Sequence, residues 1–296
     1  MLPDALVIFL QLLVNAILEG SLYAVMGVGF ALILDGMGLF NLAHGAFYVL
    51  GGYVTYYSIQ ALNLGPVGAI VLTVIFMFGV GFFIERAMVA PARVRGGRDW
   101  TLAGLIVLLA LSVTLSNLWI LIFGPEYRGI PSYVPGQIEL EGITIESQRL
   151  ISAVASFGVI GLMYLFLSYT KVGLAIRGLS QNTELSQLCG ITPSTLNSVI
   201  FGLGTLTAGV AGSLLAPIYY VSPASGDFPG LMSFVVVVIA GLGSIKGLTF
   251  AGIIIGAVDS FSSYFFSPEW GYLLAFAFCF IILSVRPTGL FGIKKE

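Results

Sequence analysis

The chain has 296 residues, of which 58% are hydrophobic and only 9% are charged, and its net charge at pH 7 is −2. A typical soluble domain carries about 25% charged residues, so this composition excludes an ordinary soluble protein and predicts an integral membrane protein. The two cysteines, Cys189 and Cys279, lie far apart and indicate neither a disulfide framework nor a zinc site. We expect membrane lipid as a partner and no nucleic acid.

A helix crosses a bilayer with about 20 apolar residues, and by that measure the sequence predicts an all-α polytopic membrane protein with eight to nine spans. Residues 1–10 lack the basic region and cleavage site of a signal peptide, so the first apolar run is expected to be retained. The glycines within 243–247 allow either two spans or one interrupted helix there. The chain, 1–296, is expected to form one membrane domain with spans at 5–34 (long enough to be broken), 43–61, 66–85, 101–123, 150–169, 196–219, 228–242, 248–266 and 271–285.

Basic residues predict the orientation, because cytoplasmic loops carry an excess of Lys and Arg. Loop 124–149 is acidic, with four Glu against two Arg, and is therefore placed outside the cell together with the N-terminus. Segment 171–195 and the C-terminus are placed in the cytosol. Termini on opposite sides require an odd number of crossings, which favours nine spans or eight and a half-crossing. The basic residues follow the third, fifth and last spans: Arg86, Arg93, Arg95, Arg98, Lys171, Arg177, Arg286, Lys294 and Lys295.

Two short stretches outside the spans have a recognisable local pattern. In loop 124–149, residues 137–141 and 143–145 alternate in polarity, which predicts a small hairpin turning at Glu141-Gly142. Segment 171–195 predicts two short amphipathic helices that meet at a polar turn, followed by a helix start with Thr192 as the N-cap and Pro193 in the first turn. The segment is either a platform on which an outside protein moves the membrane helices or an amphipathic loop lying on lipid.

Small residues recur at helix-packing spacing, which lets helix backbones approach closely in lipid. We interpret them as packing positions rather than pathway-lining ones: Gly204, Ala208, Gly212, Gly252 and Gly256.

Ionisable residues within spans are costly and indicate function by default. Glu19 is the deepest by residue count, and it is either a hydrogen-bonded or protonated packing residue or part of a translocation path. His44 beside Asn41 is expected to be an interfacial hydrogen-bond anchor rather than a proton relay. Charged residues are too few to build a proton or sodium relay typical of secondary carriers.

Catalytic motifs are missing from the sequence, which contains no HExxH, no GxSxG and no GxxxxGK[ST]. We therefore expect a transport subunit rather than an enzyme, with no cofactor of its own. Energy would have to come from a partner protein.

Several stretches spread over most of the chain carry recognisable motifs. Residues 41–53 read NLAHGAFYVLGGY, and the others are Glu85-Arg86 with Ala90-Pro91 and Arg93, 188–192, 201–212, GLGSIKG at 241–247 and RPTGLFG at 286–292. In these stretches the sequence resembles the branched-chain amino acid ABC transporter permeases, whose signature NFAHGEFYMLGAY is similar to residues 41–53. Within that family it resembles the first of the two permease paralogues.

The resemblance implies a type II ABC importer permease of the vitamin B12 and ribose permease architecture, in the inner (plasma) membrane of a prokaryote. Its partners would be a second permease, as a heterodimer, two ATP-binding subunits that hold ATP and Mg, and an extracytoplasmic solute-binding protein. The family's coupling helix falls on 177–190, which favours the platform interpretation of segment 171–195. The pathway would draw on the spans after Asn41 and around 198–212. The residues implied for ATPase coupling are Arg177, Gln181, Asn182, Glu184 and Gly190, and those for the pathway or the family motif are Glu19, Asn41, His44 and Gly45.

The chain departs from the family's pattern in several places. Ala46 replaces an acidic residue, Lys246 stands where Pro is frequent, and Gln181-Asn182 replace the acidic pair of the coupling segment, with Glu184 two places on. The Gln-Asn pair resembles the urea and short-amide branch of the superfamily. Branched-chain amino acid import is the function expected, with urea or amide import, a self-sufficient channel or carrier, and a structural scaffold as alternatives.

Overall fold

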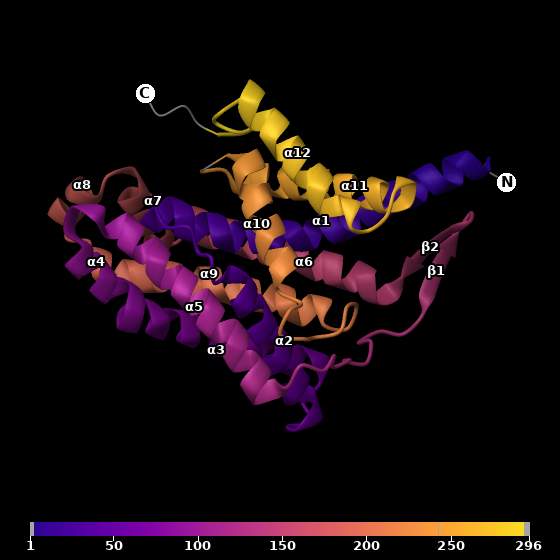
Figure 1. The fold of residues 1–296 in the computed structure, drawn as a ribbon, viewed down its shortest axis with the longest axis horizontal. Coiled ribbons are helices and arrows are strands. Elements are labelled where there is room, and N and C mark those ends of the chain that lie inside the picture. The colour runs from indigo at the N-terminus through magenta and orange to yellow at the C-terminus, as the bar shows by residue number, and fades with distance from the viewer. Residues whose placement is uncertain (1–2, 242, 293–296) are drawn as a thin grey trace.

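A computed structural model describes residues 3–241 and 243–292. These residues form a mainly helical structure with one two-stranded hairpin, and α1 runs through it as a single unbroken helix (Figure 1). The elements are α1 Asp4–Met37, α2 His44–Gln60, α3 Pro66–Ile84, a π-helical turn Glu85–Val89, α4 Ala90–Gly96, a 3-10 turn Gly97–Asp99, α5 Trp100–Phe123, β1 Gln137–Leu140, β2 Ile143–Glu146, α6 Ser147–Tyr169, α7 Lys171–Gln181, α8 Thr183–Leu188, α9 Pro193–Leu215, α10 Asp227–Ala240, α11 Ile245–Phe265 and α12 Trp270–Val285.

Six helical stretches in the described part of the chain are long and apolar enough to cross a membrane: α1, α3 with α4, α5, α6, α9 and α11. The expected count of eight to nine is not confirmed. α10 and α12 are apolar but have only 14 and 16 residues, and α2 has 17. At 1.5 Å per residue α10 is about 21 Å long, which is less than the ~30 Å hydrocarbon core. Hydropathy correctly located these apolar runs, but it does not show whether the helix that forms in each run is long enough to cross the bilayer.

The glycine break after α10 separates two helices. Gly241 and Gly243 have φ of 79° and 93°, a conformation in which side chains other than glycine are strained. The Ser244 hydroxyl then accepts a hydrogen bond from the Gly247 amide at 3.0 Å and caps α11. Two helices therefore lie here, and only α11 is long and apolar enough by itself to cross a membrane.

α9 occupies the centre of the molecule, where it packs against α1, α2 and α3. At two of its glycines a neighbouring backbone lies close enough to leave no room for a methyl group. A Cβ on Gly204 would lie 2.8 Å from the Gly29 oxygen, and one on Gly212 would overlap the Tyr48 carbonyl oxygen. α1 and α11 meet in the same manner, since a Cβ on Gly252 would lie 2.6 Å from the Gly20 oxygen. Close approach of this kind replaces the hydrophobic drive that lipid does not supply.

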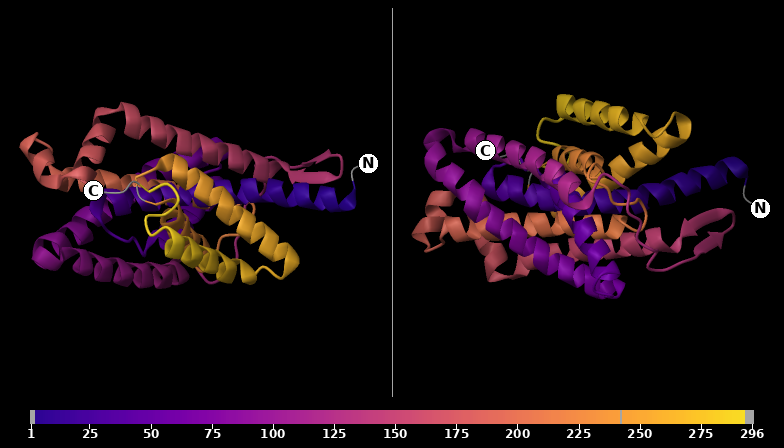
Figure 2. Two further views of the ribbon diagram at one scale, coloured as in Figure 1. Left: turned by 90° about the horizontal axis from the view of Figure 1, so that it is seen from above. Right: turned by 60° about the horizontal axis from the view of Figure 1, so that its bottom comes forward.

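The two ends of the long axis carry different elements. β1 and β2 pair antiparallel and turn at Glu141 and Gly142, which confirms the predicted hairpin. Gln11 of α1 exchanges two hydrogen bonds with the Thr144 backbone, at 2.9 and 3.0 Å, and fixes the hairpin beside the N-terminus. Both views of Figure 2 place the hairpin and the N-terminus at one end and α7 and α8 at the other. This separation agrees with the opposite sides that the charges predict for loop 124–149 and segment 171–195.

Candidate coupling surface and pathway residues

α7 and α8 meet at a turn that two side chains define. The Thr170 hydroxyl accepts from the Gly173 amide at 2.9 Å and begins α7, and the Asn182 side-chain oxygen accepts from the Leu185 amide at 3.0 Å and begins α8. Ser, Thr, Asn and Asp stabilise helix starts in this way. The sequence therefore predicted the two short helices correctly. It did not predict that Asn182 is itself the residue that caps the second one.

The platform formed by α7 and α8 has one face on the protein and one face free. Ile176 and Leu179 are buried, whereas residues 181–185 are all exposed. Leu188 is an apolar side chain with 84% of its surface exposed. Leu185, at 59%, is exposed on the same short helix.

A short hydrogen-bonded link joins the platform to α9. The Gly190 amide donates to the Gln187 oxygen at 2.9 Å, and the Ile191 amide donates to the Ser186 oxygen at 3.1 Å. Gly190 has a φ of 82°, which reverses the chain within a single residue. Thr192 is the N-cap residue of α9 and Pro193 lies in its first turn, as predicted, but the Thr192 side chain makes no capping hydrogen bond within the described structure. Pro193 has no backbone N–H, so the first turn of α9 has one fewer N–H group that needs a hydrogen-bond partner.

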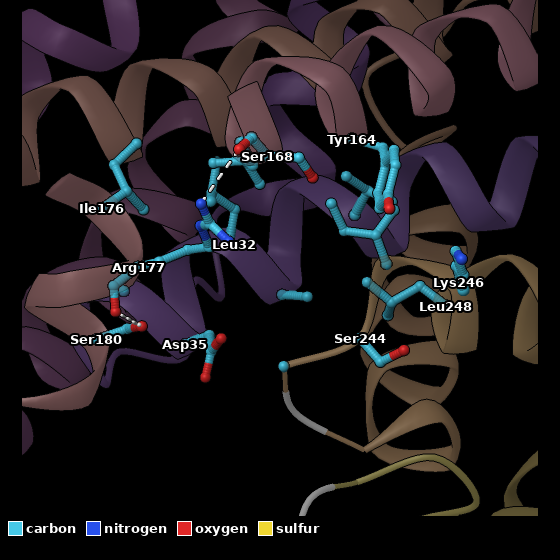
Figure 3. Close-up of a pocket in the computed structure, with 16 residues that line it drawn as sticks. Leu32, Asp35, Tyr164, Ser168, Ile176, Arg177, Ser180, Ser244, Lys246 and Leu248 are labelled. Atoms are coloured by element: carbon cyan, nitrogen blue, oxygen red, sulfur yellow. Dashed lines mark hydrogen bonds between the residues drawn. The ribbon is translucent and has the colours of Figure 1, made fainter. Parts of the chain in front are cut away.

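A cavity of about 340 Å³ lies behind the platform, between the end of α1, the end of α6, α7 and the start of α11 (Figure 3). Arg177 reaches back across it, and its guanidinium donates to the Ser168 carbonyl oxygen at 3.2 Å. Lys246 and Asp35 also line this cavity, and the Lys246 ammonium lies 5.7 Å from the Tyr164 ring centre. The five residues implied for coupling are all exposed, and Arg177 also reaches the backbone of α6: Arg177, Gln181, Asn182, Glu184 and Gly190.

A buried ion pair that the sequence did not single out as a site ties the base of α9 to the turn after α3. Glu85 is fully buried, and its carboxylate lies 2.8 Å from the Arg93 guanidinium. The Ser198 hydroxyl of α9 donates to the other Glu85 oxygen at 2.5 Å. Glu85 and Arg93 belong to a stretch that carries the family resemblance, which was the signal available. Ser198 is distant in sequence, and no local pattern connects it to them.

Glu19 lies in a polar cluster near the hairpin end of the molecule. Its carboxylate accepts from Arg149 at 3.3 Å and from the Tyr219 hydroxyl at 3.2 Å. Asp259 accepts from the Tyr23 hydroxyl at 2.7 Å, and both carboxylates line one cavity of about 430 Å³. Glu19 is thus hydrogen-bonded, as a packing residue would be, and it also lines a cavity, as a pathway residue would. Both interpretations of Glu19 stay predictions.

Asn41, His44 and Gly45 lie inside the protein. Asn41 has 0% and His44 1% of its surface exposed, and a ring nitrogen of His44, Nε2, is 3.1 Å from the Met26 carbonyl oxygen, well within α1. The hydrogen bond expected of His44 is present, and its partner is a backbone oxygen of α1. The position of His44 at a membrane interface stays a prediction. A Cβ on Gly45 would overlap the Gly226 carbonyl oxygen, so the start of α2 touches the start of α10.

Comparison of the sequence with known families and proteins gives one family. The family model described as branched-chain amino acid transport system, permease component, matches residues 12–283. The chain is 28% identical over 298 residues to the high-affinity branched-chain amino acid transport system permease protein BraD of Pseudomonas aeruginosa, with 96% of each chain covered. It is 30% identical over 302 residues to LivH of Escherichia coli K12, again with 96% of each covered. Among solved structures it is similar to a chain of PsaBC from Streptococcus pneumoniae in complex with Fab, at 17% identity and a TM-score of 0.47, covering 93% of this chain and 91% of that one.

Proposed function

Because the chain belongs to the family of permease components of branched-chain amino acid transport systems, we propose that it forms part of the transmembrane pathway of an ABC importer for branched-chain amino acids. It is a transport subunit rather than an enzyme, and ATP and Mg are held by two partner ATPases. A second, different permease completes the pathway in a type II architecture of the vitamin B12 and ribose permease kind. The assembly lies in the inner membrane of a prokaryote.

The exposed face of the platform is the observation that supports coupling to the ATPases. Gln181, Asn182 and Glu184 are exposed around the start of α8, and Leu188 provides an apolar contact beside them. An ATPase that docks there and moves α8 would move α9 as well, because the link at 189–192 is short and hydrogen-bonded. In this proposal the platform faces the cytosol, as does the C-terminus.

The replacement of the family's acidic pair by Gln181-Asn182 is compatible with this role. Asn182 caps α8, and Asn and Asp are about equally good at that position, so α8 begins correctly without the carboxylate. Glu184 lies in the first turn of α8, where the helix dipole favours a negative charge. Glu184 is thus the anionic contact for a basic residue of the ATPase.

The opposite end of the molecule receives the solute. The hairpin of β1 and β2, held to α1 through Gln11, forms the docking surface for the extracytoplasmic binding protein. The cavity beneath it is lined by Glu19 and Asp259 and opens the pathway on that side. Alternating access then follows from ATP-driven movement of α8 and α9 against the second permease.

Purification of the tagged chain from its native membrane in mild detergent, with mass spectrometry of the bound proteins, tests the assembly. We expect two ATP-binding subunits and a second permease of different sequence. Liposomes containing that complex and the binding protein should accumulate labelled leucine only with internal ATP. Recovery of the chain alone with ATP-independent transport would contradict the proposal, and ATP-driven uptake of urea without leucine would contradict its substrate.

A further inference from the structure

The N-termini of two helices of the membrane domain meet, one at the buried His44 and the other at the exposed Asp227. α2 begins at His44 and α10 at Asp227, and they touch through Gly45, Gly226 and Gly230, where a Cβ on Gly230 would lie 2.9 Å from the Gly45 Cα. The N-terminus of a helix carries a partial positive charge, which favours an anion nearby. Discontinuous helices that meet inside a membrane domain frequently border a binding site.

A cavity of about 670 Å³ lies beside this junction. Phe30 of α1 and Phe234 of α10 supply an aromatic wall, and their rings are 6.0 Å apart in an edge-to-face arrangement. Ser112 and Ser116, one helical turn apart on α5, supply hydroxyls on the opposite wall. The carboxylate of Asp227, in the first turn of α10, is exposed at the edge of the cavity.

Two polar atoms of the lining have no hydrogen-bond partner among the described residues, namely Nδ2 of Asn41 and Nδ1 of His44. Both side chains are at least 99% buried. A buried polar atom without a partner is costly, and such atoms in native structures require an explanation. A bound ligand that supplies the missing partners is one such explanation.

The hydrogen bonds that Asn41 and His44 already make show which kind of partner each side chain still needs. The Asn41 side-chain oxygen accepts from the Ala43 amide at 3.2 Å, so the Asn41 NH₂ group remains as a free donor. The His44 Nε2 faces the Met26 carbonyl oxygen, which can only accept, so Nε2 carries the proton and Nδ1 remains as a free acceptor. A ligand that satisfies both atoms therefore carries one accepting group and one donating group.

We propose that this cavity holds an α-amino acid with an apolar side chain during its passage through the membrane. The α-carboxylate accepts from the Asn41 NH₂ group and lies at the two helix N-termini. The α-ammonium donates to His44 Nδ1 and pairs with Asp227, and the apolar side chain packs on Phe30 and Phe234. A lipid acyl chain has no group that could satisfy Asn41 and His44. The inference rests on the proposed function, since it names a site for the same substrate.

A photoreactive leucine analogue with a diazirine in its side chain, added to the complete transporter, tests the site. We expect labelled peptides within 40–46 or 226–234, and we expect excess leucine to suppress the label. Asn41→Asp keeps the oxygen that caps Ala43 but replaces the free donor with an acceptor, and it should lower both labelling and uptake at saturating binding protein by about tenfold. Asn63→Asp, the same change in the exposed loop between α2 and α3, should leave both unchanged.

Two further measurements keep the outcome clear. Ser112→Leu is a second variant for the case that Asn41→Asp fails to assemble. It fills the cavity from the α5 wall without changing Asn41 or His44, and it should also reduce labelling. Label at other positions, or label that leucine does not displace, in a wild-type complex that imports leucine would overturn this site and leave the proposed function standing. A wild-type complex without ATP-driven leucine uptake would overturn the proposed function itself.

Discussion

α9 and the platform that precedes it are neighbours in the chain but are held in place differently. α9 contacts α1 and α2 through backbone atoms at Gly204 and Gly212, where even a methyl group has no room. The platform is held by two side-chain caps and a few buried side chains, with one face free. Packed interfaces of the first kind are not continuously deformable. A force applied to the platform would therefore move α9, α1 and α2 as one body rather than slide them past each other.

The largest expected effect on stability comes from adding one methyl group to the glycine packing. Gly212→Ala would place a Cβ against the Tyr48 carbonyl oxygen, a backbone atom that cannot rotate away. We expect a loss of about 3 kcal/mol in the free energy of unfolding, measured in detergent by thermal or denaturant unfolding. Gly158→Ala on α6 is the matched control, because no described atom lies within 4 Å of its added methyl group. Equal stability of the two variants would show that α9 is not held by backbone contact.

The next effect concerns the ion pair at the base of α9, where the packed region meets the platform. Glu85→Gln removes the buried charge that pairs with Arg93 and accepts from Ser198. Breaking a buried pair is strongly destabilising, but Arg93 is 22% exposed and can be partly solvated, so we expect a loss of about 2 kcal/mol. A double-mutant cycle with Arg93→Gln measures the coupling between the two side chains. A coupling energy near zero would contradict a structural role for the pair.

A smaller effect is expected within the platform. Asn182→Ala removes the cap of α8 and should cost about 1 kcal/mol, while Asn182→Asp should cost almost nothing, because a carboxylate oxygen accepts from the same amide. Hydrogen exchange of the α8 amides is the sensitive measurement, because the loss is local. Faster exchange in Asn182→Ala, with unchanged exchange in α9, would sharpen the distinction between the two regions. Faster exchange throughout α9 would remove it.

The sequence predicted what local patterns determine and missed what depends on distant neighbours. The hairpin at 137–146 follows from alternation around Glu141-Gly142, and the platform helices follow from their own amphipathic pattern. The contact of Glu85 with Ser198 spans 113 positions, and no periodicity reports it. The burial of Asn41 and His44 was not predicted for another reason. Hydropathy located the helix at 43–61, within one residue of α2 at either end, but it does not report which neighbours cover a helix.

The smallest expected effect on stability accompanies the sharpest test of coupling. Glu184 is exposed in the first turn of α8 and contacts no packed helix, so Glu184→Arg should leave the free energy of unfolding within about 0.5 kcal/mol of wild type. The same change reverses the charge that we assign to the ATPase contact, and ATP-driven leucine uptake should be abolished. Glu184→Gln, which removes the charge but keeps the shape, should retain part of the uptake. Wild-type uptake by Glu184→Arg would mean that the platform is not the coupling surface, however well it is placed to move α9.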